Sequence, residues 1–204
     1  INPHFLYNAL NTISSIAQLQ DVDYIPEIAS GLSDMFRYNI DGREIVSIRE
    51  EITQTENYMC IQKIRFPERF SVEISMEEEL FDCKVLKFIL QPIVENSYKY
   101  GFTEKKKKDI LRIRGYREAE ETIILIVEDN GVGMEEEKVQ AINEALEREA
   151  GFEAAAGIGL RNVNARIKNY YGEPCGIWLE SCLGEYTRVY LRVKSMDVSQ
   201  EKRG

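Results

Sequence analysis

The sequence predicts an α+β protein in which an N-terminal helical hairpin is followed by an α/β sandwich. Apolar residues recur with helical spacing over residues 1–66. Beyond residue 67 the pattern changes to a mixture of strand-like and helical segments, and no internal repeat interrupts either part. We therefore expect two domains, at 1–66 and 67–204.

The first helix has a single apolar stripe, formed by Leu6, Leu10, Ile13 and Ala17. A second stripe follows at 25–36, and the polar residues 20–24 form a connection of the length that joins antiparallel helices. Two helices alone leave much apolar surface exposed, so we expect the hairpin to form a four-helix bundle with a second chain. A third periodic segment, at 48–61, leads to a domain boundary at 66–68.

Alternating and β-branched segments of the second domain predict strands at 70–76, 110–116, 122–128, 177–181 and 187–193. Helical spacing predicts helices at 85–100, 135–149 and 160–170. Such a mixture is typical of helices packed on one face of a sheet. Because Pro92 falls inside the helix predicted at 85–100, we expect a kink there, at a cost of about 3 kcal/mol.

The composition excludes several classes of partner and site. A net charge of -9 and a pI of 4.9 oppose attraction to nucleic acid or to anionic lipid. The four cysteines show no C-x-x-C spacing and the chain has one histidine, so we expect reduced thiols and no zinc site. No apolar run approaches the roughly 18 residues of a membrane helix.

His4 is the only histidine, and it stands at the start of the predicted N-terminal helix. The positions that follow on the same helix face are polar: Asn8, Asn11 and Ser15. We therefore expect an exposed imidazole. It can be a solvent-facing residue at a helix start, where Asn2 caps and Pro3 supplies the first turn. It can also be a nucleophile, given a phosphoryl donor.

A glycine-rich turn follows an apolar predicted strand. Asp129, Gly131 and Gly133 form an Asp-x-Gly-x-Gly pattern, which is followed by Met134. Glycine permits a positive φ and a close approach of the backbone to a ligand. Turns of this composition are also common without a ligand, so the pattern alone leaves both interpretations open.

A second glycine-rich segment, with Gly157, Gly159 and Leu160, opens the helix predicted at 160–170. The free backbone N–H groups at a helix N-terminus can bind phosphate oxygens. An ordinary tight loop is the alternative interpretation.

Asn96 interrupts an otherwise apolar segment of the second domain. Its side-chain oxygen is a hard ligand of the kind that Mg²⁺ takes together with water and phosphate oxygens. Lys99 lies three residues on, on the same side of the predicted helix, and Tyr100 follows it. A purely structural role remains open for each of these residues.

Taken together the motifs are specific. In order and spacing, Asn96, Asp129-x-Gly131-x-Gly133 and Gly157-x-Gly159 resemble the nucleotide-binding boxes of the GHKL fold, which histidine kinases share with gyrase-type ATPases and related chaperones. The opening Asn-Pro-His-Phe-Leu-Tyr-Asn and the later Gln-Pro-Ile-Val-Glu-Asn are similar to the LytS-type histidine kinase family. The resemblance covers nearly the whole chain.

This resemblance implies a sensor histidine kinase that uses ATP and Mg²⁺. His4 would be the phosphoacceptor, Asn96 would hold Mg²⁺, and Asp129 would receive the adenine amino group. The remaining nucleotide contacts would come from Lys99, Tyr100, Gly131, Gly133, Met134, Gly157, Gly159, Leu160 and Thr187. The implied partners are a second copy of the chain and the receiver domain of a response regulator. The opening at Ile1 within a helical pattern indicates an excised fragment, and the resemblance implies that it is the cytoplasmic portion of a sensor kinase of the plasma membrane.

Two positions depart from the family pattern. Tyr100 stands where the family commonly has histidine, and Tyr186 replaces a glycine. These departures leave open a dimeric scaffold that binds nucleotide without catalysis. A GHKL ATPase is the other alternative, but its hydrolytic members resemble one another in a glutamate four residues before the Asn. That position is Pro92, which cannot accept a proton, so the kinase is favoured.

Overall fold

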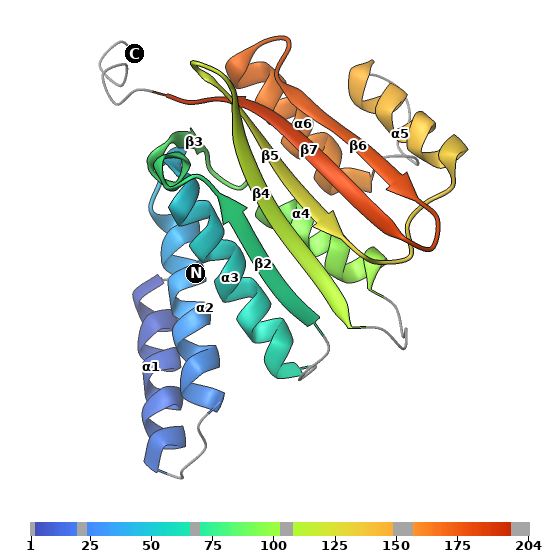
Figure 1. Ribbon diagram of the computed structural model, residues 1–204. Coiled ribbons are helices and arrows are strands. Elements are labelled where there is room, and N and C mark those ends of the chain that lie inside the picture. Colours follow the sequence, from blue (N-terminus) through green and yellow to red (C-terminus); the bar gives the residue numbers. More distant parts are fainter. Residues whose placement is uncertain (1–2, 20–23, 66–69, 103–107, 149–156, 197–204) are drawn as a thin grey trace.

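The computed structural model describes residues 3–19, 24–65, 70–102, 108–148 and 157–196. It confirms the predicted fold class, because N-terminal helices lead into a sandwich of one sheet and a layer of helices (Figure 1). The predicted boundary at 66–68 lies outside the described residues. In the described part of the chain, no helix is both long and apolar enough to cross a membrane.

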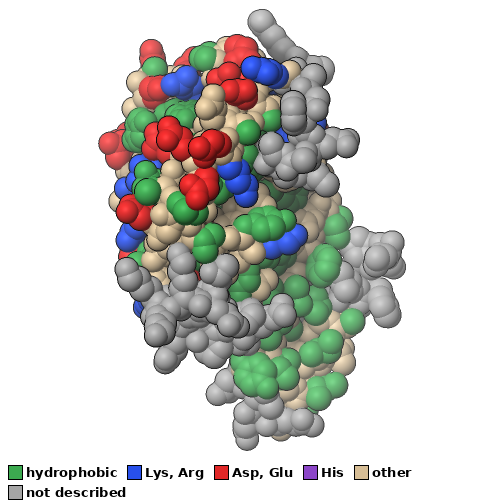
Figure 2. Space-filling model, turned by 90° about the vertical axis from the view of Figure 1, so that its right-hand side faces the viewer, with side chains coloured by type: hydrophobic (Ala, Val, Ile, Leu, Met, Phe, Trp, Pro, Cys, Tyr) green, Lys and Arg blue, Asp and Glu red, His purple; other side chains and the backbone are tan. Residues whose placement is uncertain are grey.

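The first two helices, α1 (Pro3–Leu19) and α2 (Tyr24–Ile40), pack side by side as the predicted hairpin (Figure 1). Several large apolar side chains of this hairpin are exposed: Ile13, Ile16, Leu19, Tyr24 and Ile40. Figure 2 shows hydrophobic side chains gathered over the lower part of the molecule, at the height of the hairpin, and acidic ones at the top. The hairpin therefore has apolar surface that the described part of this chain leaves exposed.

The prediction of continuous helical structure over residues 1–66 is wrong at one place. A short strand, β1 (Ile45–Ser47), precedes α3 (Ile48–Arg65) and pairs antiparallel with β3 (Lys84–Leu86). Ser47 also caps α3, since its hydroxyl accepts from Glu50 N–H at 3.2 Å and the Glu50 carboxylate accepts from Ser47 N–H at 2.8 Å. Pairing with a distant strand cannot be read from local periodicity.

The sandwich has a five-stranded sheet among the described residues, in the order β2-β4-β5-β7-β6. Its strands are β2 (Phe70–Met76), β4 (Asp109–Ala119), β5 (Thr122–Asp129), β6 (Gly176–Cys182) and β7 (Tyr186–Lys194). β2 runs parallel to β4, and the other neighbours are antiparallel. All five strands were predicted, and each end agrees to within three residues.

Helices α4 (Gln91–Asn96), α5 (Glu136–Glu147) and α6 (Gly157–Tyr171) cover one face of the sheet (Figure 1). The core lies between the two layers and includes Ile93, Leu125, Val127, Ile167 and Leu179. α3 packs at the β2 side and contributes Ile48, Ile52 and Met59 to the same core. The strand β5 is central, so the residue at its end lies deep in the sandwich.

The helix predicted at 85–100 is wrong in its first half. Residues 84–86 form β3, α4 begins only at Gln91, and Ser97–Gly101 form a π-helical turn. The reason is that the N–H groups of residues 88–90 bond to a side chain of α3 and not to carbonyls one turn back. Pro92 therefore falls in the first turn of α4, where no N–H is needed, and the predicted kink is absent.

Helix α6 begins three residues earlier than predicted. Gly157 and Gly159 lie within its first turn, where the sequence indicated a turn ahead of the helix. Helix α5 is close to its predicted extent. The four cysteines form no disulfide in the described structure.

Candidate functional site

Asp129 is the last residue of the central strand β5 and is 2% exposed. The sheet register places it opposite Leu111 of β4 and Thr187 of β7. An aspartate at this depth must be hydrogen-bonded, because burial of an unpaired carboxylate is costly. Its partners therefore reveal how the site is built.

The turn after Asp129 folds back onto its carboxylate. Gly131 N–H donates to Asp129 Oδ1 at 3.0 Å, and Val132 N–H donates to the carbonyl of Gly101 at 3.0 Å. Gly184 N–H, from the hairpin between β6 and β7, donates to the carbonyl of Val132 at 2.6 Å. These backbone bonds hold the turn between the π-helical turn that follows α4 and the β6–β7 hairpin.

Two positions of this turn require glycine, because other atoms lie where a side chain would begin. A Cβ on Gly131 would lie 2.4 Å from the Gly101 carbonyl oxygen and 2.6 Å from Asp129 Oδ1. Gly133 has φ +63°, and a Cβ there would lie 1.9 Å from the Cys182 carbonyl oxygen. The Asp-x-Gly-x-Gly pattern of the sequence is therefore explained by space as well as by backbone conformation.

The Gly131→Ala variant is expected to lower the free energy of unfolding by about 1–3 kcal/mol, because the added methyl group overlaps two oxygen atoms that cannot both retreat. Gly31→Ala is the matched control, since a Cβ in the middle of α2 would meet nothing nearer than 3.8 Å. The control should be neutral or stabilising by about 0.5–1 kcal/mol. Urea denaturation of both variants measures the difference, and equal midpoints would contradict the packing argument.

Asp129 is held as a hydrogen-bond acceptor. Burial raises the pKa of its carboxyl group above the ordinary value, and hydrogen bonds from Ser97 and from Gly131 N–H partly offset that rise. With Gly131 on one oxygen, the carboxylate keeps acceptor capacity for a ligand that brings its own donor. Such a site suits an exocyclic amine of a heterocycle.

Asn96 is the last residue of α4, and the first turn of α6 passes beside it. A Cβ on Gly159 would lie 3.5 Å from Asn96 Nδ2 and 3.9 Å from Oδ1. The structure thus brings together two predicted site residues that are far apart in the sequence. An amide oxygen has the chemistry of a hard metal ligand, and the N–H groups at a helix N-terminus can bind phosphate oxygens. In the described chain there is no cluster of three or more His, Cys, Asp or Glu that could hold a metal ion.

Sequence reasoning missed two hydroxyl groups of this region. Ser97 donates to Asp129, and Ser181 Oγ accepts from Met134 N–H at 2.9 Å. Ser181 also donates to the Tyr186 carbonyl at 2.6 Å and lies 3.1 Å from the Thr187 hydroxyl. Ser181 and Thr187 are register partners in neighbouring strands, so only strand pairing could have identified the contact.

The other predicted residues have different surroundings. Lys99 and Tyr100 are exposed in the π-helical turn, with the Lys99 ammonium 4.9 Å from the centre of the Tyr100 ring. They are therefore not part of the buried cluster around Asp129. Gly157 begins α6 and Leu160 is half-buried in it. His4 lies in the first turn of α1, and its side chain is outside the described structure.

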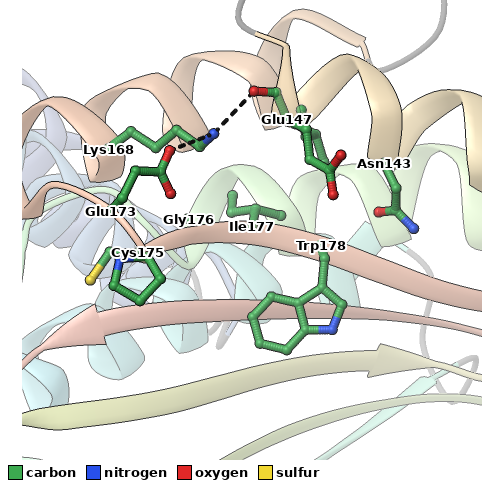
Figure 3. A pocket seen from close by; sticks show the side chains of 10 residues that line it. Asn143, Glu147, Lys168, Glu173, Cys175, Gly176, Ile177 and Trp178 are labelled. Atoms are coloured by element: carbon green, nitrogen blue, oxygen red, sulfur yellow. Dashed lines mark hydrogen bonds and ion pairs between the residues drawn. The ribbon is translucent and has the colours of Figure 1, made fainter.

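A separate cavity of about 420 Å³ lies between α5, α6 and the start of β6 (Figure 3). Lys168 extends across it, with its ammonium 3.2 Å from the Glu173 carboxylate and 3.3 Å from the Glu147 carbonyl (Figure 3). This cavity lies at the Gly176 end of β6, whereas Ser181 lies near the other end. It is distinct from the cluster around Asp129.

Family models match both parts of the chain. Residues 1–70 match the model described as histidine kinase, and residues 82–196 match the model of histidine kinase-, DNA gyrase B- and HSP90-like ATPases. Among curated proteins, the chain is 30% identical over 184 residues to the sensor histidine kinase/phosphatase LytS of Staphylococcus aureus strains Mu50 and N315. The alignment covers 89% of this chain but 31% of those relatives, so the chain spans about a third of their length.

Solved structures are similar in fold. The histidine kinase domain of a blue-light-activated kinase from Erythrobacter litoralis has a TM-score of 0.51 at 12% identity, with 94% of this chain and 93% of that chain covered. The mycobacterial sensor histidine kinase MprB has a TM-score of 0.54 at 13% identity, with 76% and 99% covered. At these identities the likeness concerns the arrangement of helices and strands.

Proposed function

The chain belongs to the histidine kinase family, and from this premise we propose that it binds Mg-ATP and transfers the γ-phosphoryl group to His4 as part of a two-component sensor. The observation that carries the proposal is Asp129, a buried carboxylate at the end of the central strand with one oxygen bonded to its own glycine turn. This arrangement suits the amino group of adenine. The relatives named LytS are sensor histidine kinase/phosphatases.

The surrounding residues are assigned to the rest of the nucleotide. Asn96 fits a magnesium ion, because its amide oxygen is a hard donor beside the first turn of α6. When bound, Mg²⁺ neutralises charge that develops on the β- and γ-phosphates. The N–H groups at the start of α6 would bind phosphate oxygens, and Thr187 would lie near adenine. Met134, Leu160, Gly133 and Gly157 would frame the nucleotide, with Lys99 and Tyr100 at its exposed side.

Phosphoryl transfer also depends on where α1 lies. Along the molecule, α1 packs on α2, α2 on α3, and α3 on α4 (Figure 1). His4 and Asn96 are thus on helices separated by two others. Transfer therefore needs either a rearrangement of the hairpin relative to the sandwich or the histidine of a second copy. The exposed apolar side chains of the hairpin support such a dimer.

The remaining roles concern the whole protein. We assign residues 1–66 to dimerisation and histidine phosphotransfer and residues 67–204 to ATP binding and catalysis. The phosphoryl group would pass from His4 to an aspartate of a response regulator receiver domain. The chain would be the cytoplasmic portion of a longer sensor anchored in the plasma membrane.

Labelling with γ-labelled ATP tests the function. A kinase is expected to acquire label that is acid-labile and base-stable, as phosphohistidine is, in a reaction that requires Mg²⁺. Steady release of phosphate without protein label would instead favour a GHKL ATPase. Tight binding without either reaction would favour a nucleotide-binding scaffold, the alternative that Tyr100 and Tyr186 raise. Absence of heat on titration with millimolar adenine nucleotides would exclude all three functions.

A further inference from the structure

A buried carboxylate in α3 organises the chain immediately ahead of α4. Glu51 is 1% exposed and accepts three consecutive backbone N–H groups, from Phe88 at 2.6 Å, Ile89 at 2.8 Å and Leu90 at 2.9 Å. Ile89 and Leu90 are fully buried, so these donors have no access to water. Without the carboxylate, their N–H groups would be unsatisfied at substantial cost.

The backbone conformation at this point depends on that carboxylate. Phe88 has φ +60°, which is unusual for a residue other than glycine and turns the three N–H groups toward one point. Gln91, the first residue of α4, follows directly, and Asn96 ends the same helix five residues later. At about 1.5 Å of rise per residue, the helix between Leu90 and Asn96 is short and rigid, so the position of Asn96 depends on that of Leu90.

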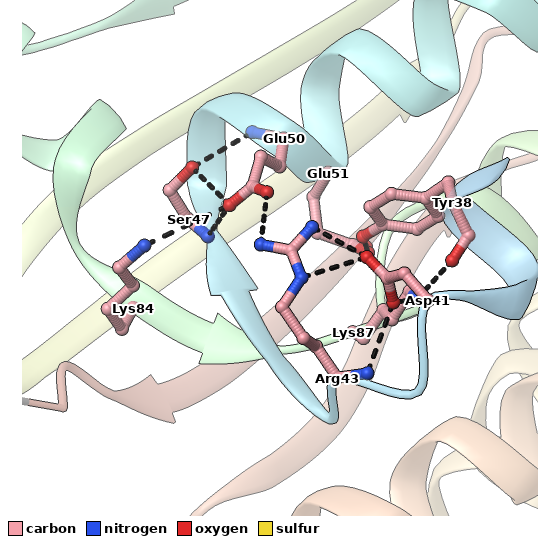
Figure 4. Close-up of polar contacts among 8 residues, drawn as sticks. All are labelled: Tyr38, Asp41, Arg43, Ser47, Glu50, Glu51, Lys84 and Lys87. Carbon is pink, nitrogen blue, oxygen red and sulfur yellow. Dashed lines mark hydrogen bonds and ion pairs between the residues drawn. The ribbon is translucent and has the colours of Figure 1, made fainter. Parts of the chain in front are cut away.

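The same carboxylate also binds the hairpin. The Tyr38 hydroxyl, from the last turns of α2, donates to Glu51 Oε1, the oxygen that also accepts Phe88 N–H (Figure 4). The Tyr38 ring packs edge-on against that of Phe88, with centroids 5.2 Å apart. Burial, followed by the charge of Glu51, raises the pKa of Tyr38 far above its ordinary value, so the hydroxyl keeps its proton and remains a donor.

A second contact joins the same two segments. Lys87 is 3% exposed, and its ammonium group binds both the Tyr38 carbonyl and the carboxylate of Asp41, the residue after α2 (Figure 4). Burial raises the pKa of Asp41, but hydrogen bonds from Lys87 and Arg43 outweigh it and lower the value to about 2. The Asp41 carboxyl group is therefore ionised at neutral pH. α2 thus contacts residues 87 and 88 through charge, ring packing and a shared carboxylate.

Helix α6, which carries part of the proposed nucleotide site, also contacts the segment 86–90. The Tyr171 hydroxyl, at the end of α6, accepts a hydrogen bond from Leu86 N–H at 2.9 Å. The other end of α6 carries Gly159, which lies beside Asn96. Residues 86–90 are therefore the place where the hairpin, α3, α4 and α6 meet.

We propose that Glu51 is a positioning residue for phosphoryl transfer, which couples the end of α2 to α4 and so links the phosphoacceptor hairpin to the helix that carries Asn96. The inference rests on the proposed function. A displacement of α2 would move the Tyr38 hydroxyl, and with it the carboxylate that holds residues 88–90. Displacement of α4 by a nucleotide would act on α2 in the reverse direction, since such coupling is reciprocal.

The Tyr38→Phe variant isolates the bond between α2 and Glu51, because it removes one hydroxyl and leaves the ring and the three N–H bonds to Glu51 in place. We expect its dissociation constant for Mg-ATP to remain within about twofold of the wild-type value. We expect the rate of His4 labelling at saturating ATP to fall about tenfold, in the usual range for coupled sites. Tyr190→Phe is the matched control, since it removes a Tyr–Glu hydrogen bond of 2.8 Å on the β7–β6 pair.

Hydrogen exchange supplies a readout that does not need phosphoryl transfer. In free Tyr38→Phe protein, amide exchange at residues 86–96 should accelerate while β5 and β7 keep their wild-type protection. A role in stability alone would accelerate exchange throughout and lower binding and labelling together. In Glu51→Gln, a single amide oxygen and an NH₂ group face the three donors, so both ATP affinity and protection at residues 88–96 should fall.

The outcomes separate the two proposals. If the wild-type protein never forms phosphohistidine, the proposed function fails, and exchange at residues 86–96 still decides the coupling. The coupling is overturned if Tyr38→Phe shows wild-type exchange at residues 86–96. It is equally overturned if the wild type forms phosphohistidine and Tyr38→Phe is labelled at the same rate. The same holds if the labelling rate of the control Tyr190→Phe falls as much as that of Tyr38→Phe.

Discussion

The His4→Gln variant is expected to lose all acid-labile label from γ-labelled ATP while binding Mg-ATP with unchanged affinity. Glutamine cannot form a phosphoramidate at a ring nitrogen, and the chain contains no second histidine to replace His4. The residue lies in the first turn of α1, outside the sandwich that contains the assigned nucleotide residues. Filter binding after acid and base treatment, with calorimetry for ATP, measures the two effects separately.

Gln18→Ala is a suitable control, because Gln18 is an exposed residue of the same helix. It should label at the wild-type rate. Acid-labile label that persists in His4→Gln would rule out His4 as the acceptor. A parallel loss of ATP binding would show that the substitution disturbs the sandwich and not the phosphoryl acceptor alone.

The Asp129→Asn variant is expected to raise the dissociation constant for ATP by about 10- to 100-fold, the effect of losing a hydrogen bond to a charged acceptor. A carboxylate has two acceptor oxygens, whereas an amide has one. If that oxygen accepts Gly131 N–H, as Asp129 Oδ1 does at 3.0 Å, the NH₂ group faces the adenine amino group. In the opposite orientation it faces Gly131. In either orientation, the NH₂ group of the new side chain therefore faces another hydrogen-bond donor.

The folding stability of Asp129→Asn, in contrast to its ATP affinity, should not fall. Burial raises the pKa of Asp129, so the folded state favours the protonated acid more than the unfolded state does. The stability contributed by the protonated acid is therefore lost as pH rises through the folded pKa. Asparagine does not ionise, so Asp129→Asn should be at least as stable as wild type at pH 7, with a smaller decline in stability between acid and neutral pH.

Urea denaturation across this pH range and calorimetry with Mg-ATP test both parts. Asp34→Asn provides the control, because it makes the same chemical change at a half-exposed position of α2. Retention of ATP binding within twofold in Asp129→Asn would remove Asp129 from adenine recognition. A large loss of stability at neutral pH would mean that its hydrogen bonds outweigh the cost of burying its charge.

The strands were predictable because their signal is local. Each of the five sheet strands carries β-branched or alternating residues that favour a half-buried pleated segment whatever its neighbours. The glycine turn after Asp129 was also predictable, since glycine at such positions reflects a need for close backbone approach or a positive φ. The family resemblance drawn from these motifs is confirmed by the family models.

The helix predicted at 85–100 shows the limit of prediction from local sequence patterns. Its apolar residues fit a helical period, yet residues 84–86 pair with β1, and residues 88–90 bond to Glu51. These partners lie more than 30 residues away in the chain, and their contribution outweighs helix propensity. For the same reason Ser97 and Ser181 could not be assigned to the site, because their importance comes from the atoms that face them.

By itself the sequence determined the fold class and the family, and it supplied the residues that we assign to the nucleotide. These depend on spacing and residue type, which act over a few positions. The tertiary structure decided where α4 and α6 begin, that Asn96 lies beside Gly159, and that Glu51 joins α2 to α4. Those features arise from contacts between segments far apart in the chain, and a buried donor or carboxylate takes the partner that packing brings to it.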